Sequence, residues 1–293
     1  MSASSPPRVS VGIPVFNGEP FIREALDSVV GQTFEDLEII ISDNASTDGT
    51  ESICQEYAQK DARIRYVRNR ENIGLAKNFQ RVVELATAEY FKLANADDLC
   101  GPDLVSQCVQ VLDRDPTIVL CYGKTTLIDG EGRTLREYED GLDLRSPNVT
   151  ERFRLALERV RLVNVLQGVM RADALRRTAL LDTYVGADMV LVVELALRGR
   201  FLELPERLFQ RRIHAGAFSS QVSEEGQMGT WEPGARRSTD LYFWRHYRGY
   251  FRAVSRAPLP AATKLRLASV VMKRAITARG VLTHELFNSV RRR

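Results

Sequence analysis

Two adjacent carboxylates, Asp97 and Asp98, end a short apolar run that begins at Tyr90. Paired carboxylates at the tip of a strand can hold a divalent cation beside the phosphates of a ligand. Aspartate is also favoured at helix starts for structural reasons, so a helix-capping turn is the alternative interpretation of this pair. The elements that carry the pair decide between the two hypotheses.

Apolar, β-branched segments alternate with segments of helical spacing through the first half of the chain. The pattern predicts strands at residues 9–15, 37–42, 63–68, 90–95 and 118–122, and helices at 20–30, 47–60, 75–86 and 101–112. Because parallel neighbours need helical crossovers, this alternation favours an α/β fold, a mostly parallel sheet with helices on both faces.

Ligands of such sheets bind at the carboxyl ends of the strands. Three polar clusters are expected at that edge: residues 14–17 after the first strand, 42–46 after the second, and 97–98 after the fourth. Three suited clusters at three strand ends favour a binding site over an isolated surface turn.

The later part of the chain is less regular. Residues 124–147 are expected to form loops with short strands, and 201–213 to be extended with a break at Pro205. Helices are predicted at 149–160, 172–181 and 186–199, and an amphipathic helix around 262–282.

Length and composition describe an ordinary globular chain. The 293 residues are 44% hydrophobic and 27% charged, and no stretch approaches the roughly 20 apolar residues that span a bilayer. The polar start lacks the apolar centre of a secretory signal, so a cytoplasmic location is expected. Four widely spaced cysteines, with no Cys-x-x-Cys, are expected to be reduced packing residues.

Charge is unevenly distributed along the chain. Residues 236–293 hold 14 basic and 2 acidic side chains, a net +12, whereas residues 1–235 carry −9. A basic segment on an acidic body is expected to meet an anionic membrane surface at the inner face of the membrane, the body itself, or another subunit as a homodimer. Nucleic acid is not expected, because no aromatic and basic interleaving accompanies the charge.

Four motifs together resemble the signatures of family 2 glycosyltransferases with the GT-A fold. They are residues 9–17, 41–50, 72–78 and 95–98, and the resemblance covers roughly residues 8–215. It implies a Rossmann-like GT-A domain at residues 1–215, with the acceptor side at about 124–215, followed by a helical basic region at 216–293. It also implies inverting transfer of a sugar from a nucleotide diphosphate donor to an acceptor hydroxyl.

The resemblance assigns the donor site residue by residue. Asp43 would accept a hydrogen bond from the donor base, which favours a UDP- or dTDP-sugar, and Lys77 would reach the diphosphate. The alternatives are a helix-capping turn for Asp43 and a solvated surface position for Lys77. The full implied donor set is Pro14, Val15, Phe16, Asn17, Glu19, Asp43, Asn44, Lys77, Asn78, Asn95, Ala96, Asp97 and Arg212.

The family's metal motif, Asp-x-Asp, is altered here because its first position is Asn95. An uncharged amide can still bond a ribose hydroxyl, but metal ligation then falls on Asp97 and Asp98. His214 resembles the family's late histidine, which would complete a Mn²⁺ or Mg²⁺ site, and its alternative role is structural.

An inverting transfer also needs a base opposite the leaving group. By resemblance this base is Asp188, at the start of the helix predicted at 186–199, where the helix dipole favours its ionised form. The alternative role for Asp188 is the cap of that helix, and Glu194 is the second candidate base.

The donor sugar and the acceptor are not specified by the sequence. A glycan or glycolipid of a bacterial polysaccharide or cell envelope is the family-level expectation, with a sugar-nucleotide nucleotidyltransferase or a non-catalytic nucleotide-sugar-binding module as rival functions.

Overall fold

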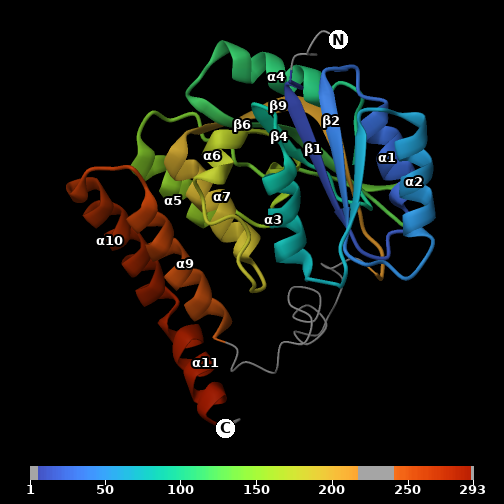
Figure 1. Cartoon of the computed structure of the whole chain (residues 1–293). Coiled ribbons are helices and arrows are strands. Elements are labelled where there is room, and N and C mark those ends of the chain that lie inside the picture. The colour runs from blue at the N-terminus through green and yellow to red at the C-terminus, as the bar shows by residue number, and fades with distance from the viewer. Residues whose placement is uncertain (1–5, 217–240, 292–293) are drawn as a thin grey trace.

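Nine strands form one sheet within the described part of the computed structural model, which comprises residues 6–216 and 241–291 (Figure 1). They are β1 (Val9–Val15), β2 (Leu37–Asp43), β3 (Ile64–Arg68), β4 (Tyr90–Leu93), β5 (Leu99–Cys100), β6 (Ile118–Ile128), β7 (Thr134–Tyr138), β8 (Val169–Arg171) and β9 (Arg200–Arg212). Their order is β3-β2-β1-β4-β8-β6-β9-β5, with β7 paired to β6. The four strands from β3 to β4 are parallel neighbours, which confirms the predicted α/β sheet.

One antiparallel strand interrupts this arrangement. β8 lies between β4 and β6 and is antiparallel to both, so β6 keeps the direction of the first four strands without pairing with β4. β9 pairs with β6 in parallel as one long strand. Within it Leu204 pairs with Gly123 and Arg207 with Lys124, so Pro205 lies in a bulge. Proline has no N–H for the ladder, which explains why the expected break is a bulge.

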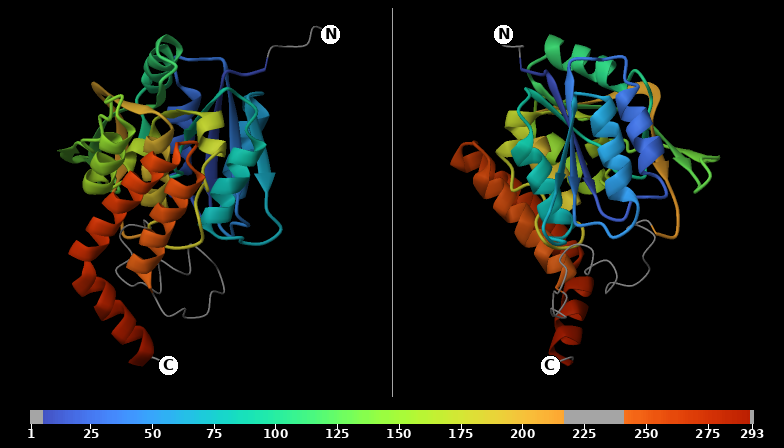
Figure 2. Two further views of the ribbon diagram at one scale, coloured as in Figure 1. Left: turned by 90° about the vertical axis from the view of Figure 1, so that its left-hand side faces the viewer. Right: turned by 45° about the vertical axis from the view of Figure 1, so that its right-hand side comes forward.

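Helices cover both faces of the sheet (Figures 1 and 2). They are α1 (Ile22–Val30), α2 (Thr50–Lys60), α3 (Leu75–Leu85), α4 (Leu104–Arg114), α5 (Val149–Arg159), α6 (Ala172–Arg176) and α7 (Ala187–Arg198), with the 3-10 helix η1 (Asn164–Gln167). Side chains alternate across β2: Ile39 and Ile41 join the core under α1, α2 and α4, whereas Ile40 joins the core under α3, α5, α6 and α7. Two apolar cores therefore fix the sheet from both sides.

The C-terminal region contains three helices in its described part, α9 (Tyr242–Arg256), α10 (Ala261–Thr277) and α11 (Arg279–Arg291). The single helix predicted at 262–282 is therefore wrong, since it divides at Ala278, close to Gly280, a poor helix former. The helix predicted at 172–181 is also too long and ends at Arg176. There the Thr178 hydroxyl donates to the Leu175 carbonyl and accepts the Leu180 N–H, which competes with further helix.

The C-terminal helices share the core of the body. Leu267, Val271 and Leu282 are buried in the same apolar cluster as α5 and α7. Gly249 allows α9 to approach α7 and the loop before it, because a Cβ at this position would lie 3.0 Å from Val190 Cγ1 and 2.6 Å from the Tyr184 hydroxyl. The expected domain boundary after residue 215 borders residues 217–240, which lie outside the described residues. Across the described residues, no helix is both long enough and apolar enough to cross a bilayer.

An ion pair between a buried carboxylate and a partly exposed arginine joins α7 to α9. The Glu194 side chain is 2% exposed, and its two carboxylate oxygens accept from Arg256 Nε and Nη2 at 3.1 and 2.9 Å. The same carboxylate also accepts from Arg198 and from the Ala179 N–H. Glu194 is thus fully engaged in packing, which corrects its interpretation as a second candidate base.

We predict that Arg256→Met lowers the stability of the whole chain. Breaking one side of a buried pair leaves Glu194 undercompensated, and the partial exposure of Arg256 reduces the expected cost to about 2 kcal/mol. Urea unfolding followed by circular dichroism measures this effect. Glu194→Gln alone and in combination with Arg256→Met completes a double-mutant cycle, and Arg252→Met on the same helix is the matched control. Additive losses would show that the pair contributes no coupling.

Candidate active site

Three strand ends meet at one edge of the sheet. Val15 at the end of β1 pairs with Asp43 at the end of β2, and the Asn44 N–H donates to the Val15 carbonyl at 2.8 Å. On the other side of β1, the Ala94 N–H after β4 donates to the Gly12 carbonyl at 2.9 Å. This register brings the three predicted polar clusters to the same edge, as expected from the sequence.

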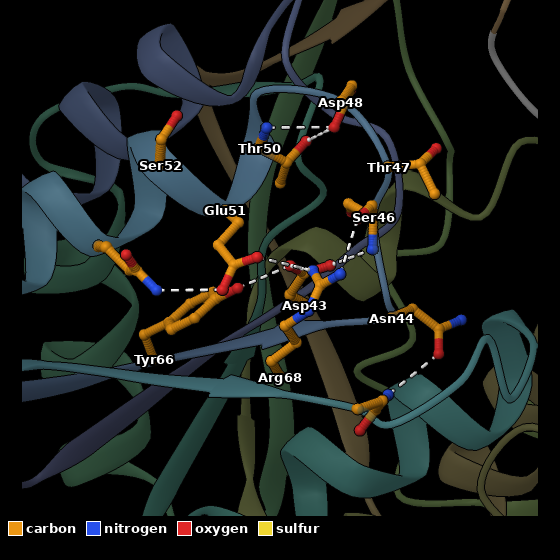
Figure 3. A network of polar contacts seen from close by, with 12 residues as sticks. Asp43, Asn44, Ser46, Thr47, Asp48, Thr50, Glu51, Ser52, Tyr66 and Arg68 are labelled. Atoms are coloured by element: carbon orange, nitrogen blue, oxygen red, sulfur yellow. Dashed lines mark hydrogen bonds and ion pairs between the residues drawn. The ribbon is translucent and has the colours of Figure 1, made fainter.

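Asp43 lies at the centre of a polar network (Figure 3). Its Oδ1 accepts the Ser46 N–H at 2.8 Å, while its Oδ2 accepts from the Tyr66 hydroxyl and from Arg68 Nη1, both at 2.7 Å. Arg68 also donates to the Ser46 carbonyl and lies 3.4 Å from Glu51. The chain itself therefore uses three of the roughly four acceptor positions of this carboxylate.

The protonation of Asp43 follows from these contacts. Burial by itself would raise the pKa of the carboxyl, but hydrogen bonds from Ser46, Tyr66 and Arg68 outweigh it and hold the pKa below its ordinary value. Burial and the neighbouring carboxylate also raise the pKa of the Tyr66 phenol, so this hydroxyl remains a donor. Asp43 is consequently an anion at neutral pH.

Several residues of the implied donor set are instead used to build the loops. Asn17 has a positive φ of 50°, and its Oδ1 accepts the Thr47 N–H, while Glu19 accepts the Gly49 N–H at 2.8 Å. Asn44 Oδ1 accepts the Ile73 N–H, and its amide donates to Asn72.

Asn78 is buried and bonds both to the Ser42 hydroxyl and to the Ser42 carbonyl. In contrast, Phe16 and Lys77 are exposed at the rim, and neither is engaged in this scaffolding. Pro14, Asn95 and Ala96 are only partly buried, whereas Val15 is buried in the core. The accessible part of the donor set is thus smaller than the sequence implied.

A carboxylate and an imidazole face each other at the end of β4. Asp97 Oδ2 lies 3.1 Å from His214 Nε2, and both side chains keep some exposure. The His214 ring packs on Phe21 with centroids 4.4 Å apart. A carboxylate oxygen and an imidazole nitrogen are both ligand types that bind divalent cations. The described residues contain no cluster of three or more potential metal-ligating side chains, so a cation here needs further oxygens from its ligand.

Asp98 is placed differently from Asp97. It is 6% exposed, its Oδ1 accepts the backbone N–H of Arg212 at 2.8 Å, and its Oδ2 accepts the Asn95 amide at 2.8 Å. Burial, and then the neighbouring Asp97 carboxylate, raise the pKa of Asp98 to about 7. Asp98 therefore fixes the strand ends together, and the altered motif residue Asn95 is its partner.

Arg212 is buried in the protein rather than directed at a diphosphate. Its guanidinium donates to Glu24, to the Asp97 carbonyl and to the Gly130 carbonyl, and it stacks on Phe21 at 4.8 Å. Because its side chain has no exposed surface, we assign Arg212 a supporting role, in place of the donor contact expected from the sequence.

Asp188 lies in the first turn of α7. Its Oδ1 accepts the Met189 N–H at 2.8 Å. Burial raises the pKa of its carboxyl, an effect opposed by that bond and by the nearby charges of His246 and Arg211. The loop before it is held by α9, since His246 Nε2 donates to the Gly186 carbonyl at 3.1 Å. Asp188 is thus positioned in part by the C-terminal region.

Two residues of the site, Tyr66 and Arg68, were not assigned from the sequence. Tyr66 and Arg68 both contact Asp43 because they are two residues apart on β3 and so lie on the same face of the strand. This two-residue spacing is visible in the sequence. Arg211 donates to Asn164 and to the Leu162 carbonyl, and its charge acts on both Asp98 and Asp188. The sequence suggested Arg211, together with Arg212, as a partner of the donor diphosphate, whereas in the structure its guanidinium bonds groups of the protein.

The fold is that of GT-A glycosyltransferases, and solved structures of that class superpose on this chain. TarS residues 1–349 of S. aureus in complex with UDP align with a TM-score of 0.62 at 18% identity, covering 92% of this chain and 72% of that TarS chain. The mannosyltransferase PcManGT of Pyrobaculum calidifontis in complex with GDP-Man and Mn²⁺ aligns with a TM-score of 0.55 at 20% identity, covering 98% and 87%.

The chain belongs to glycosyl transferase family 2, whose model matches residues 10–180. An uncharacterized glycosyltransferase of Haemophilus influenzae is 27% identical over 224 residues, 75% of this chain and 69% of that protein. An uncharacterized protein of Mycobacterium tuberculosis is 33% identical over 208 residues, 68% of this chain but 57% of that protein's length. The protein is therefore a glycosyltransferase.

We predict that Asp43→Asn makes the free energy of unfolding depend less on pH in the acid range. Because the pKa of Asp43 is lower in the folded chain than the ordinary value near 4, its contribution is present above that value and is lost as pH falls through the folded pKa. The variant should lose about 2 kcal/mol at pH 7 and less at pH 3, as measured by urea unfolding. Asp36→Asn, at an exposed carboxylate, is the control. Parallel pH curves for wild type and Asp43→Asn would contradict this prediction.

Proposed function

We propose that this glycosyltransferase is metal-dependent and inverting, and moves a sugar from a nucleotide diphosphate donor to an acceptor hydroxyl. The observation that carries the proposal is the placement of two acidic centres on different elements. Asp97, after β4, faces His214, after β9, whereas Asp188 lies in the first turn of α7. One centre suits the leaving diphosphate and the other suits the incoming hydroxyl.

A nucleotide donor is supported by the neighbours, since TarS was solved with UDP and with UDP-GlcNAc, and PcManGT with GDP-Man. Because the Asp43 side chain, like that of Arg212, has no exposed surface, we infer that Asp43 supports the base pocket through Ser46, Tyr66 and Arg68, in place of the base contact expected from the sequence. Phe16, exposed beside it, can stack on the base, and Lys77 can reach the diphosphate from the first turn of α3.

A divalent cation fits the Asp97 and His214 pair. When bound, Mn²⁺ or Mg²⁺ would neutralise charge on the departing nucleotide diphosphate. Asp98 is withheld from the ligand set in this proposal, because its two oxygens already accept from Arg212 and Asn95. The Asp98 bonds hold Asp97 in place for its role.

Asp188 is proposed as the general base. It accepts the proton of the acceptor hydroxyl while that oxygen attacks the anomeric carbon, and the bond from that carbon to the diphosphate oxygen breaks on the opposite face. Configuration is inverted and no covalent enzyme intermediate forms. A carboxyl whose pKa is raised by burial is a stronger base than an exposed aspartate, which suits this role.

The acceptor is proposed to be a glycan or glycolipid of a bacterial polysaccharide or cell envelope, bound by residues 124–215 beside the C-terminal helices. Family membership argues against a nucleotidyltransferase. Family membership also argues against a binding module without activity. Slow release of free sugar from the donor in the absence of acceptor would separate an enzyme from such a module.

We predict that Asp188→Asn lowers sugar transfer by roughly 10²- to 10⁴-fold, because the amide cannot take the proton. Binding of nucleoside diphosphate, measured by calorimetry, should remain unchanged. In the wild type, kcat should fall as pH drops through the raised pKa of Asp188, above the ordinary aspartate range. Asp182→Asn, at an exposed carboxylate six residues earlier, is the control. Transfer at the wild-type rate by Asp188→Asn would remove it from this role.

We predict that Asp97→Asn abolishes the gain in nucleotide affinity caused by Mn²⁺. With only two protein ligands, losing the anionic one should reduce the Mn²⁺ enhancement by at least about tenfold. Calorimetry with UDP, dTDP and GDP, each with Mn²⁺ and with chelator, measures the enhancement. The chelator values should match the wild type, and Asp103→Asn serves as the control. A full Mn²⁺ enhancement in Asp97→Asn would exclude this cation site.

A further inference from the structure

One face of α10 is apolar and exposed. Leu265, Met272 and Ile276 are 73%, 51% and 54% exposed, and their spacing of seven and four residues places them on one side of the helix. Leu267 and Val271, which pack on the body, lie on the other side and have no exposure. The outward residues are therefore additional to those that dock the helix.

The next helix, α11, also carries an exposed apolar side chain, since Phe287 is 70% exposed. Figures 1 and 2 show α10 and α11 following one another along the outer side of the C-terminal region, with α11 extending beyond the body. Exposed apolar groups thus recur over two successive helices.

A groove adjoins this stripe. A cavity of about 610 Å³ lies between α9, α10 and α11, and Trp244, Phe251, Met272 and Leu282 contribute apolar lining. Two exposed arginines of α9, Arg248 and Arg252, also line it. Met272 belongs both to the groove and to the outward stripe, so the two features form one continuous surface.

The charge of this surface is strongly positive. Arg248, Arg252, Lys273 and Arg279 are exposed around the groove and stripe, whereas the only acidic residue among 241–291 is Glu285. Within the described residues, no carboxylate forms an ion pair with Arg248 or Arg252. We call Leu265, Met272, Ile276 and Phe287, with these four basic residues, the outer face.

We propose that the outer face docks on the surface of an anionic lipid bilayer. Exposed apolar side chains flanked by lysine and arginine are the pattern of an interfacial helix, in which the apolar groups enter the headgroup region and the cations meet acidic lipids. A contact between two copies through the same face would oppose their rows of positive charge. The bilayer supplies the opposite charge along the whole face.

Flotation of the full chain with phospholipid vesicles tests this proposal without any turnover. The protein should float at low salt with phosphatidylcholine vesicles containing phosphatidylglycerol, and less with pure phosphatidylcholine or at high salt. Leu265→Ser combined with Ile276→Ser, and separately Arg248→Gln combined with Arg252→Gln, should each lower partitioning by about tenfold or more.

Two matched controls keep the test specific. Leu135→Ser removes an apolar side chain of 55% exposure from β7, and Arg65→Gln combined with Arg114→Gln removes two exposed cations from β3 and α4. Both controls should float like the wild type. Because all substituted side chains are exposed, unchanged far-UV spectra and melting are expected throughout.

Three results would overturn the proposal. One is failure of the wild type to float with anionic vesicles at low salt. Another is wild-type flotation of both outer-face variants. The third is a stable dimer, seen by analytical ultracentrifugation, that Leu265→Ser with Ile276→Ser dissociates while vesicle binding is unchanged, since the outer face would then be an interface between copies.

Discussion

The parallel alignment of β1 with β2 and β4 is the constraint on which the site depends. In that alignment Val15 pairs with Asp43 and Gly12 with Leu93, so the chain leaves all three strands at the same edge. Backbone bonds from Asn44 to Val15 and from Ala94 to Gly12 extend the pairing one residue past the strands. Backbone hydrogen bonds alone therefore bring the residues that follow the three strands to one edge, independently of the contacts that their side chains make.

A second requirement arises because this edge is crowded with polar groups. A buried charge is tolerated only with partners, and here the partners come from the protein. Asp43 is matched by Arg68, and Asp98 by the Arg212 backbone and Asn95. In each case a fixed, buried group stands beside a more accessible one. Asp98 lies behind Asp97, and the network of Asp43 lies behind the exposed Phe16.

Much of the fold follows from periodicity, because burial on both faces of a parallel strand leaves continuous apolar runs such as residues 39–41. The strand β8 was missed because three residues carry no readable period. For the site, the positions at strand ends were predictable from the sequence. Which of these residues support the loops and which remain accessible to a ligand was not. Whether Asn78 and Arg212 meet a ligand or the protein depends on partners far along the chain, such as Ser42 and Glu24. Residue type alone is compatible with both.

The C-terminal region supports the site by holding the loop before Asp188. On α9, His246, Tyr250 and Ala253 lie on the side that packs against the body, and His246 holds the carbonyl of Gly186, two residues before Asp188. Trp244, Arg248 and Arg252 lie on the opposite side, where they line the groove. One helix therefore separates the loop that carries Asp188 from the basic outer face. Without α9, Glu194 would lose Arg256, and the Gly186 carbonyl would lose its donor. The conformation of the Asp188 loop consequently depends on a helix that lies outside the matched family region.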